Sequence, residues 1–182
     1  MKNELIVHKD PKSPISETFR TLRTNIQFIN NKEKLRTILL TSTLPEEGKS
    51  FVSANLAITF VQAGKKVILV DADMRKGRQY SIFNISPSPG LSNCLLDFSE
   101  EDCKTRISEY IRQTPVEGLD VMPAGNIPPN PSELLVSETM LDILQELKEN
   151  YDIVILDGPP VRTCNRFSYF NKNSRFHNYS NS

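Results

Sequence analysis

The chain has 182 residues, and its 22 Lys and Arg balance 22 Asp and Glu, so its formal net charge is zero. Hydrophobic residues make up 38% and charged residues 24%, which is typical of a soluble domain of mixed class, and the length argues for one compact core. The neutral charge argues against an electrostatic binder of nucleic acid or membranes, and the absence of a long apolar run argues against a membrane span or a signal peptide.

The first half of the chain is predicted to alternate helices and strands. Apolar residues at three- and four-residue steps predict an amphipathic helix over residues 14–28. A short apolar run predicts a buried strand over 37–42, and a polar loop follows at 43–48. A helical pattern over 49–63 then leads to a second buried strand over 66–71. Strand, loop, helix and strand in this order form a βαβ unit with a right-handed crossover.

The second half continues the pattern less regularly. We expect, in chain order, a surface excursion over 76–90, one or two short helices within 91–110, a short strand over 119–122, a Pro-rich turn over 125–131, a helix from Ser132 through Leu147 and a strand over 151–156. This alternation predicts an α/β fold with a doubly wound, mostly parallel sheet. Three cysteines, Cys94, Cys103 and Cys164, lack metal-ligand spacing, so we expect reduced thiols in a cytoplasmic protein.

A phosphate-binding loop is predicted where Gly48-Lys49-Ser50 joins the first buried strand to the following helix. A helix N-terminus offers unpaired N–H groups to an anion, Gly48 lets the backbone approach it, Lys49 can reach the β- and γ-phosphates, and Ser50 can ligate Mg²⁺. The standard P-loop pattern has Gly five residues before Gly48, where this chain has Thr43. A bare pattern search would therefore reject the loop, and only its position between strand and helix supports it.

Carboxylates follow two of the predicted strands. Asp71 and Asp73 end the strand over 66–71, and Asp157 ends the strand over 151–156. Because parallel strands present their carboxyl ends at one edge of an open sheet, all three carboxylates are expected beside the phosphate-binding loop. Asp71 and Asp73 could hold the water shell of a metal or accept a proton, and an Asp in the position of Asp157 helps to hold Mg²⁺ in P-loop NTPases.

Together these motifs resemble the bacterial tyrosine kinases of capsule and exopolysaccharide synthesis, which use a P-loop with a small hydroxylated residue in place of the first Gly. The resemblance covers about residues 5–161. The stretches that carry it are 42–50 (STLPEEGKS), 70–75 (VDADMR) and 155–160 (ILDGPP), with 14–26, which is similar to the Glu-x-x-Arg-x-x-Arg helix of that family, 90–93 (GLSN) and 127–135 (IPPNPSELL).

The resemblance implies autophosphorylation on tyrosine with ATP and Mg²⁺ as cofactors. It implies catalytic roles for Lys49, Asp71 and Asp73, with either aspartate a candidate base. The metal would be served by Ser50, Asp71 and Asp157. The nucleotide would be bound by Thr43, Glu47, Gly48, Lys49, Ser50, Phe51 and Arg75, and subunits of a ring would touch through Glu17, Arg20 and Arg23.

The implied setting is the inner face of the cell membrane. Without a membrane span of its own, the chain is expected to be cytoplasmic and to bind a transmembrane adaptor that activates it, with no nucleic-acid partner. Two other functions stay open from the residues. One is a partition-type P-loop ATPase without kinase activity, and the other is an inactive nucleotide-binding fragment.

The end of the chain departs from the family. We expect residues 1–161 to form the kinase domain and 162–182 to be a basic, Asn- and Ser-rich tail that is disordered or foreign to the fold. Our hypothesis is that the sequence after Val161 reflects a truncated or frameshifted gene. The sheet would then lack its last strands, leaving the strand over 151–156 with less cover. Tyr169 and Tyr179 form no tyrosine cluster, so we do not expect them to be phosphosites.

Overall fold

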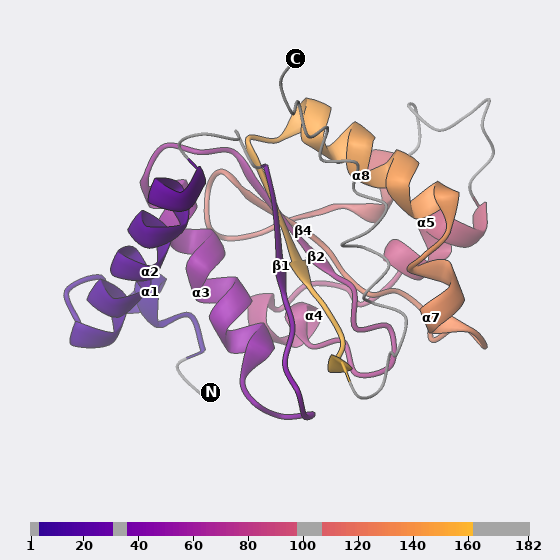
Figure 1. Cartoon of the computed structure of the whole chain (residues 1–182), viewed down its shortest axis with the longest axis horizontal. Helices are drawn as coiled ribbons and strands as arrows, with labels where there is room; N and C mark the ends of the chain where they lie inside the picture. The colour runs from indigo at the N-terminus through magenta and orange to yellow at the C-terminus, as the bar shows by residue number, and fades with distance from the viewer. Residues whose placement is uncertain (1–3, 31–35, 98–106, 162–182) are drawn as a thin grey trace, which may run out of the picture.

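A computed structural model describes residues 4–30, 36–97 and 107–161, which form three layers with a five-stranded sheet in the middle (Figure 1). The strands are β1 (Thr37–Leu40), β2 (Val67–Asp71), β3 (Arg112–Gln113), β4 (Leu119–Met122) and β5 (Ile153–Asp157). The helices are α1 (Ile6–Lys9), α2 (Pro14–Asn30), α3 (Lys49–Gln62), α4 (Gln79–Phe83), α5 (Leu91–Asp97), the 3-10 turn η1 (Ile107–Tyr110), α7 (Pro131–Leu134) and α8 (Glu138–Asn150).

The sheet has the order β1-β5-β2-β4-β3, and only the pairing of β3 with β4 is antiparallel. The predicted α/β fold with a mostly parallel sheet is therefore confirmed. In the register of the parallel strands, Leu40 of β1 and Asp71 of β2 both lie opposite Asp157 of β5. The carboxyl ends of these three strands thus meet at one edge.

Both faces of the sheet are buried, because residues of the central strands alternate between two hydrophobic clusters. Val67 and Leu69 of β2 pack with α1, α2, α3 and α4 on one face, while Ile68 and Val70 pack with α5, α7 and α8 on the other. Figure 1 shows α1, α2 and α3 on one side of the sheet and α5, α7 and α8 on the other. The sequences of β2 and β5 are therefore apolar at nearly every position because both faces of these strands are buried.

The strand β5 is an interior strand, which corrects the expectation that residues 151–156 would have reduced cover. It lies between β1 and β2, and all five of its residues are buried. Among the described strands, β1 is the one at the parallel edge of the sheet, and its Leu39 is 37% exposed. The βαβ unit from β1 through α3 to β2 accordingly passes over β5 instead of joining neighbouring strands.

Three predicted segments differ from the structure. The strand predicted to be buried over 37–42 is β1, which ends at Leu40 and has no buried residue because it lies at the edge of the sheet. The excursion over 76–90 includes the short helix α4, whose residues Ile82 and Phe83 are buried in the core. The single helix predicted from Ser132 is two helices, α7 and α8, because Ser137 caps α8 by accepting a hydrogen bond from Met140 N at 3.2 Å. A hydrophobic pattern alone does not show this break, since Leu135 is buried at the junction.

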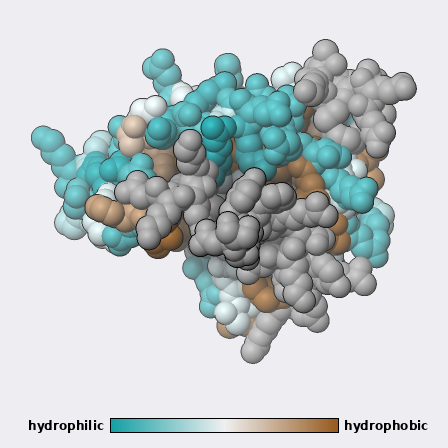
Figure 2. All heavy atoms as spheres, turned by 45° about the horizontal axis from the view of Figure 1, so that its top comes forward, coloured by the Kyte–Doolittle hydropathy of each residue, from teal (hydrophilic) through white to brown (hydrophobic). Residues whose placement is uncertain are grey.

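The face of the molecule seen in Figure 2 is mostly polar where its residues are described. Figure 2 shows hydrophilic side chains over much of the visible described surface, with hydrophobic side chains in separate patches. None of the helices in the described ranges has the length and hydrophobicity needed to cross a bilayer. Cys94 is buried in the core. Cys103, Cys164, Tyr169, Tyr179 and the tail over 162–182 lie outside the described residues, so the predictions made for them stay predictions.

Candidate nucleotide-binding site

The loop between β1 and α3 has the backbone that a phosphate-binding loop needs. It enters the left-handed region at Glu46, with φ of 65°, and at Gly48, with φ of 83°. A β-carbon at Gly48 would meet nothing within 4 Å, so this glycine is required for its conformation and not for space. Thr43 does not have a positive φ, which explains in backbone terms why the first position of this loop tolerates a residue other than Gly.

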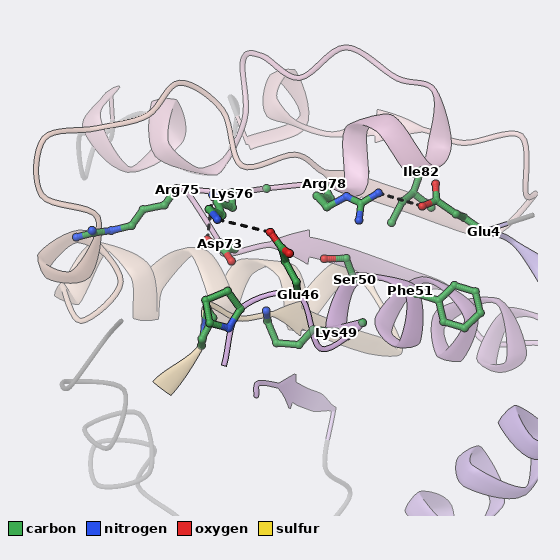
Figure 3. Close-up of a pocket in the computed structure, with 14 residues that line it drawn as sticks. Glu4, Glu46, Lys49, Ser50, Phe51, Asp73, Arg75, Lys76, Arg78 and Ile82 are labelled. Carbon is green, nitrogen blue, oxygen red and sulfur yellow. Dashed lines mark hydrogen bonds and ion pairs between the residues drawn. The ribbon is translucent and has the colours of Figure 1, made fainter. Parts of the chain in front are cut away.

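A pocket of about 770 Å³ opens above this loop. Its walls are the loop itself, the first turn of α3, the segment from Asp73 to Arg78, and Pro160 after β5. Figure 3 shows Lys49 and Ser50 close to Glu46 and Asp73, whereas the Arg75 side chain extends away from them. Phe51 lines the pocket beyond Ser50 and also packs edge-on against Phe19 of α2, with ring centroids 5.8 Å apart.

Glu47 stabilises the loop through hydrogen bonds to its backbone. Its Oε2 accepts hydrogen bonds from Thr43 N at 3.0 Å and from Leu44 N at 3.1 Å. The carboxylate therefore satisfies two backbone donors that a phosphate-binding loop would otherwise expose. Thr43 and Glu47 thus contribute to the shape of the loop, and neither residue is among those that line the pocket.

Two acidic residues of the pocket hold basic partners that no sequence motif indicates. Lys76 Nζ lies 3.9 Å from Glu46 Oε1, and Arg78 Nη2 lies 3.0 Å from Glu4 Oε1 (Figure 3). Both basic residues follow β2 in the segment predicted as a surface excursion, where a charged residue looks like ordinary solvated surface. With Lys49 and Arg75, four basic side chains therefore line the same pocket, where phosphates would be attracted.

Asp71 and Asp157 form a buried acidic pair. They lie opposite each other on adjacent parallel strands, and both are 0% exposed. Burial, reinforced by the charge of Asp157, raises the pKa of Asp71 to about 8. Burial also raises the pKa of Asp157, although hydrogen bonds from Ser50 and Gln79 and the charge of Lys49 oppose that rise. A cation at this edge of the sheet would stabilise both carboxylates in the ionised form.

The two aspartates after β2 have different surroundings. Both oxygens of Asp71 accept backbone hydrogen bonds, from Gln79 N at 2.9 Å and from Asp73 N at 3.3 Å. Asp73 lines the pocket, with one oxygen accepting from Lys76 N at 3.1 Å. Of the two candidate bases, Asp73 is therefore the one placed to meet a molecule in the pocket.

Gln79 was missed by sequence reasoning, yet its buried side chain joins several site residues. Its Nε2 donates to Asp157 Oδ2 at 2.7 Å, to Ser53 Oγ at 2.9 Å and to the carbonyl of Ser50 at 3.1 Å. Neither Gln79 Oε1 nor Asp157 Oδ1 has a hydrogen-bond partner among the described residues, although both atoms are buried. A lone Gln in an irregular segment carries no signal in the sequence that could have indicated this role.

The site fits a magnesium ion that is held mainly through phosphates and water. The described ranges contain no group of three or more His, Cys, Asp or Glu arranged to hold a metal by themselves. Mg²⁺ usually takes only one or two carboxylates, with phosphate oxygens and water completing its shell. The unpartnered Oδ1 of Asp157 is a suitable acceptor for such a water, and the hydroxyl of Ser50 lies at the start of α3 beside it.

The predicted subunit-contact residues all lie on α2. Glu17 Oε2 and Arg20 Nη1 form an ion pair at 2.8 Å, with side chains 69% and 27% exposed. Arg23 instead points toward α3, where its Nη1 donates to the carbonyl of Thr59 at 2.9 Å. The same helix exposes Ile15 and Leu22.

The chain matches the family model of the AAA domain over residues 36–168. It is 45% identical over 159 residues to the putative tyrosine-protein kinase CapB of Staphylococcus aureus, covering 87% of this chain and 67% of CapB. It is 40% identical over 161 residues to the tyrosine-protein kinase YwqD of Bacillus subtilis (strain 168), covering 88% of this chain and 65% of YwqD. The chain therefore spans about two thirds of the length of these relatives.

Solved structures place the fold in the same group. The crystal structure of the chimerical protein CapA2B2 superposes with a TM-score of 0.84 at 44% identity, covering 94% of this chain and 73% of that one. The cell division ATPase MinD of Pyrococcus furiosus has a TM-score of 0.55 at 22% identity, covering 67% of this chain and 49% of that one, which shows a shared fold alone. The chain belongs to the bacterial tyrosine-protein kinases that include CapB and YwqD, within the AAA-domain family.

Proposed function

We propose that this chain is the catalytic part of an ATP- and Mg²⁺-dependent protein-tyrosine kinase that phosphorylates itself and regulates capsule or exopolysaccharide synthesis. The observation that carries the proposal is the meeting of Lys49, Ser50, Asp73 and Asp157 at one edge of the sheet in a chain 45% identical to a tyrosine-kinase relative. The fold alone does not favour a kinase over a partition-type ATPase, because MinD shares it.

The roles of the residues follow from their positions. Lys49 and the N–H groups at the start of α3 bind the β- and γ-phosphates. Asp73 accepts the proton of the tyrosine hydroxyl, and the tyrosine oxygen forms a bond to the γ-phosphorus. The bond from that phosphorus to the β–γ bridging oxygen breaks, and ADP leaves. Asp71 is held by two backbone donors and stabilises the turn that presents Asp73.

Ser50 and Asp157 would hold Mg²⁺, with Asp71 behind them. When bound, the ion neutralises charge on the phosphates that react. Phe51 and Gly48 border the nucleotide, Thr43 and Glu47 maintain the loop, and Arg75 supplies positive charge from the rim of the pocket.

The assembly of the active form belongs to the same proposal. Subunits would meet in a ring through the exposed side of α2, with Glu17, Arg20 and Arg23 in or near the contact. A transmembrane adaptor would recruit the chain to the inner face of the cell membrane and activate it there. The exposed ion pair of Glu17 and Arg20 beside Ile15 and Leu22 supports a contact surface on this helix.

Incubation with labelled ATP and Mg²⁺, followed by phosphoamino-acid analysis, tests the activity. We expect the wild-type chain, mixed with its adaptor, to form phosphotyrosine on an added Glu-Tyr copolymer, because Tyr169 and Tyr179 are not expected phosphosites. We expect none from Lys49→Met, which lacks the ammonium group at the phosphates. Lys65→Met is the matched control, because Lys65 is an exposed lysine just after the opposite end of α3. Release of phosphate without phosphotyrosine would favour the ATPase alternative, and binding without turnover would favour an inactive nucleotide-binding fragment.

A further inference from the structure

Gln79 occupies a position that the proposed catalytic roles do not explain. It is the first residue of α4, and its side chain is 0% exposed. A buried amide that served only to fill space would be replaced at no cost by an apolar side chain, since leaving polar groups unpaired inside a protein is unfavourable. Here the amide instead contacts α3 and β5, two of the elements that build the site.

The hydrogen bonds determine which way the amide is turned. Three oxygen atoms, Asp157 Oδ2, Ser53 Oγ and the Ser50 carbonyl, lie within 3.1 Å of Nε2. Placing the amide oxygen there would bring it against the carboxylate and the carbonyl, which can only accept. The NH₂ group therefore faces these atoms, with its shortest hydrogen bond to the charged partner, Asp157.

The backbone of the same residue is equally engaged. Gln79 N donates to Asp71 Oδ2 at 2.9 Å, and two residues earlier the chain passes so close that a β-carbon on Gly77 would lie 2.9 Å from that oxygen. The segment from Gly77 to Gln79 thus wraps tightly around Asp71. One residue consequently fixes the carboxylates at the ends of both β2 and β5.

Two buried oxygen atoms without hydrogen-bond partners among the described residues indicate that this arrangement receives donors from a ligand. Gln79 Oε1 and Asp157 Oδ1 are both buried and lack partners within the described part of the chain. Such acceptors fit donors that arrive with a ligand, and water molecules bound to a divalent cation are donors of this kind. Residues that orient a metal-binding carboxylate in this way commonly change metal affinity by roughly 10- to 100-fold when they are replaced.

We propose that Gln79 is a positioning residue for the divalent-cation site: it holds Asp157 against the first turn of α3 and thereby couples Mg²⁺ binding to nucleotide binding. The inference rests on the proposed function, because it assigns the cation to the nucleotide site described above. A merely structural Gln79 would stabilise the packing of α4 on α3 without affecting this coupling.

The test is the affinity for a fluorescent ADP analogue, measured in EDTA and over a range of MgCl₂ concentrations. Gln79→Met keeps the length of the side chain and the backbone N–H but loses the amide. We expect its affinity in EDTA to equal that of the wild type. We expect the Mg²⁺ concentration for half-maximal tightening to rise roughly 10- to 100-fold. Ser53→Ala is the control, because it removes another acceptor of the same amide and leaves the hydrogen bond to Asp157 in place.

Gln79→Asn provides a second variant that keeps a buried amide but is one methylene too short to reach Asp157, so it decides the question if Gln79→Met fails to fold. Loss of Mg²⁺-dependent tightening in either folded variant, with Ser53→Ala unaffected, supports the inference. A variant that melts at a lower temperature yet keeps the wild-type Mg²⁺ response overturns it. If the wild type itself binds no nucleotide, or binds without responding to Mg²⁺, the proposed function fails first and this inference with it.

Discussion

Replacing Arg23 tests whether this residue stabilises its own subunit through α3 or only contacts a neighbouring subunit. Its guanidinium donates to the carbonyl of Thr59 in the last turn of α3, 36 residues away along the chain. A hydrogen bond from a charged donor contributes about 1.5–3 kcal/mol, and a cation near a helix C-terminus adds about 0.3–1 kcal/mol. Against this, Arg23 Nε is buried without a partner among the described residues, which lowers the gain. We therefore expect Arg23→Met to lower the free energy of unfolding by about 2 kcal/mol.

Urea unfolding followed by circular dichroism measures this loss. With a typical urea dependence of about 2 kcal/mol per M, the midpoint should fall by about 1 M. Glu17→Gln is the matched control on the same helix, because its exposed ion pair with Arg20 contributes at most about 1 kcal/mol. Sedimentation velocity on the same samples reports assembly. An unchanged unfolding midpoint in Arg23→Met, combined with lost assembly, would refute the role assigned to the contact with α3.

Three further predictions concern the site and the core. Because Asp71 has a pKa of about 8 when folded and an ordinary value of 3.8 when unfolded, the folded state binds more protons between these pH values. Stability in EDTA should therefore fall by several kcal/mol as the pH rises from 4 to 8.5, and a rising or flat urea midpoint would contradict this. Glu47→Ala should weaken nucleotide binding several-fold by freeing two backbone donors of the loop, and Glu47→Gln should restore most of it, as titration calorimetry would show. Tyr151→Phe should cost about 1–2 kcal/mol of unfolding free energy by removing the 2.7 Å hydrogen bond to Asp120, and unchanged urea unfolding would argue against that hydrogen bond.

Much of the site could be predicted because it depends on local pattern. The strand β4 has its predicted bounds, and β2, β5 and α3 differ from prediction by one or two residues, since each is a long apolar run or a clear helical period. Parallel strands present their last residues at one edge of the sheet, so the positions of Asp71 and Asp157 at two strand ends predict that both lie at that edge, although not that they are neighbours.

The remaining features depend on tertiary contacts that leave little trace in the sequence. The order of the strands could not be predicted, because an apolar run fits an interior strand between any two neighbours. The helix α4 is only five residues long and is stabilised by burial of Ile82 and Phe83, so no period reveals it. Gln79 reaches Asp157 only because the chain turns back after Asp71, which is a property of the folded loop.

The interior position of β5 has a consequence for how this protein is made. β1 and β2 pair on either side of β5, although β5 is synthesised after both of them. Residues 41–152 lie between β1 and β5, so these contacts close a very long loop, and such contacts slow folding. Until the ribosome has made β5, β1 has no strand to pair with, and the part of the sheet that covers the apolar face of α3 is incomplete. We therefore expect the sheet to be completed only after β5 emerges, with apolar surface of the nascent chain exposed until then.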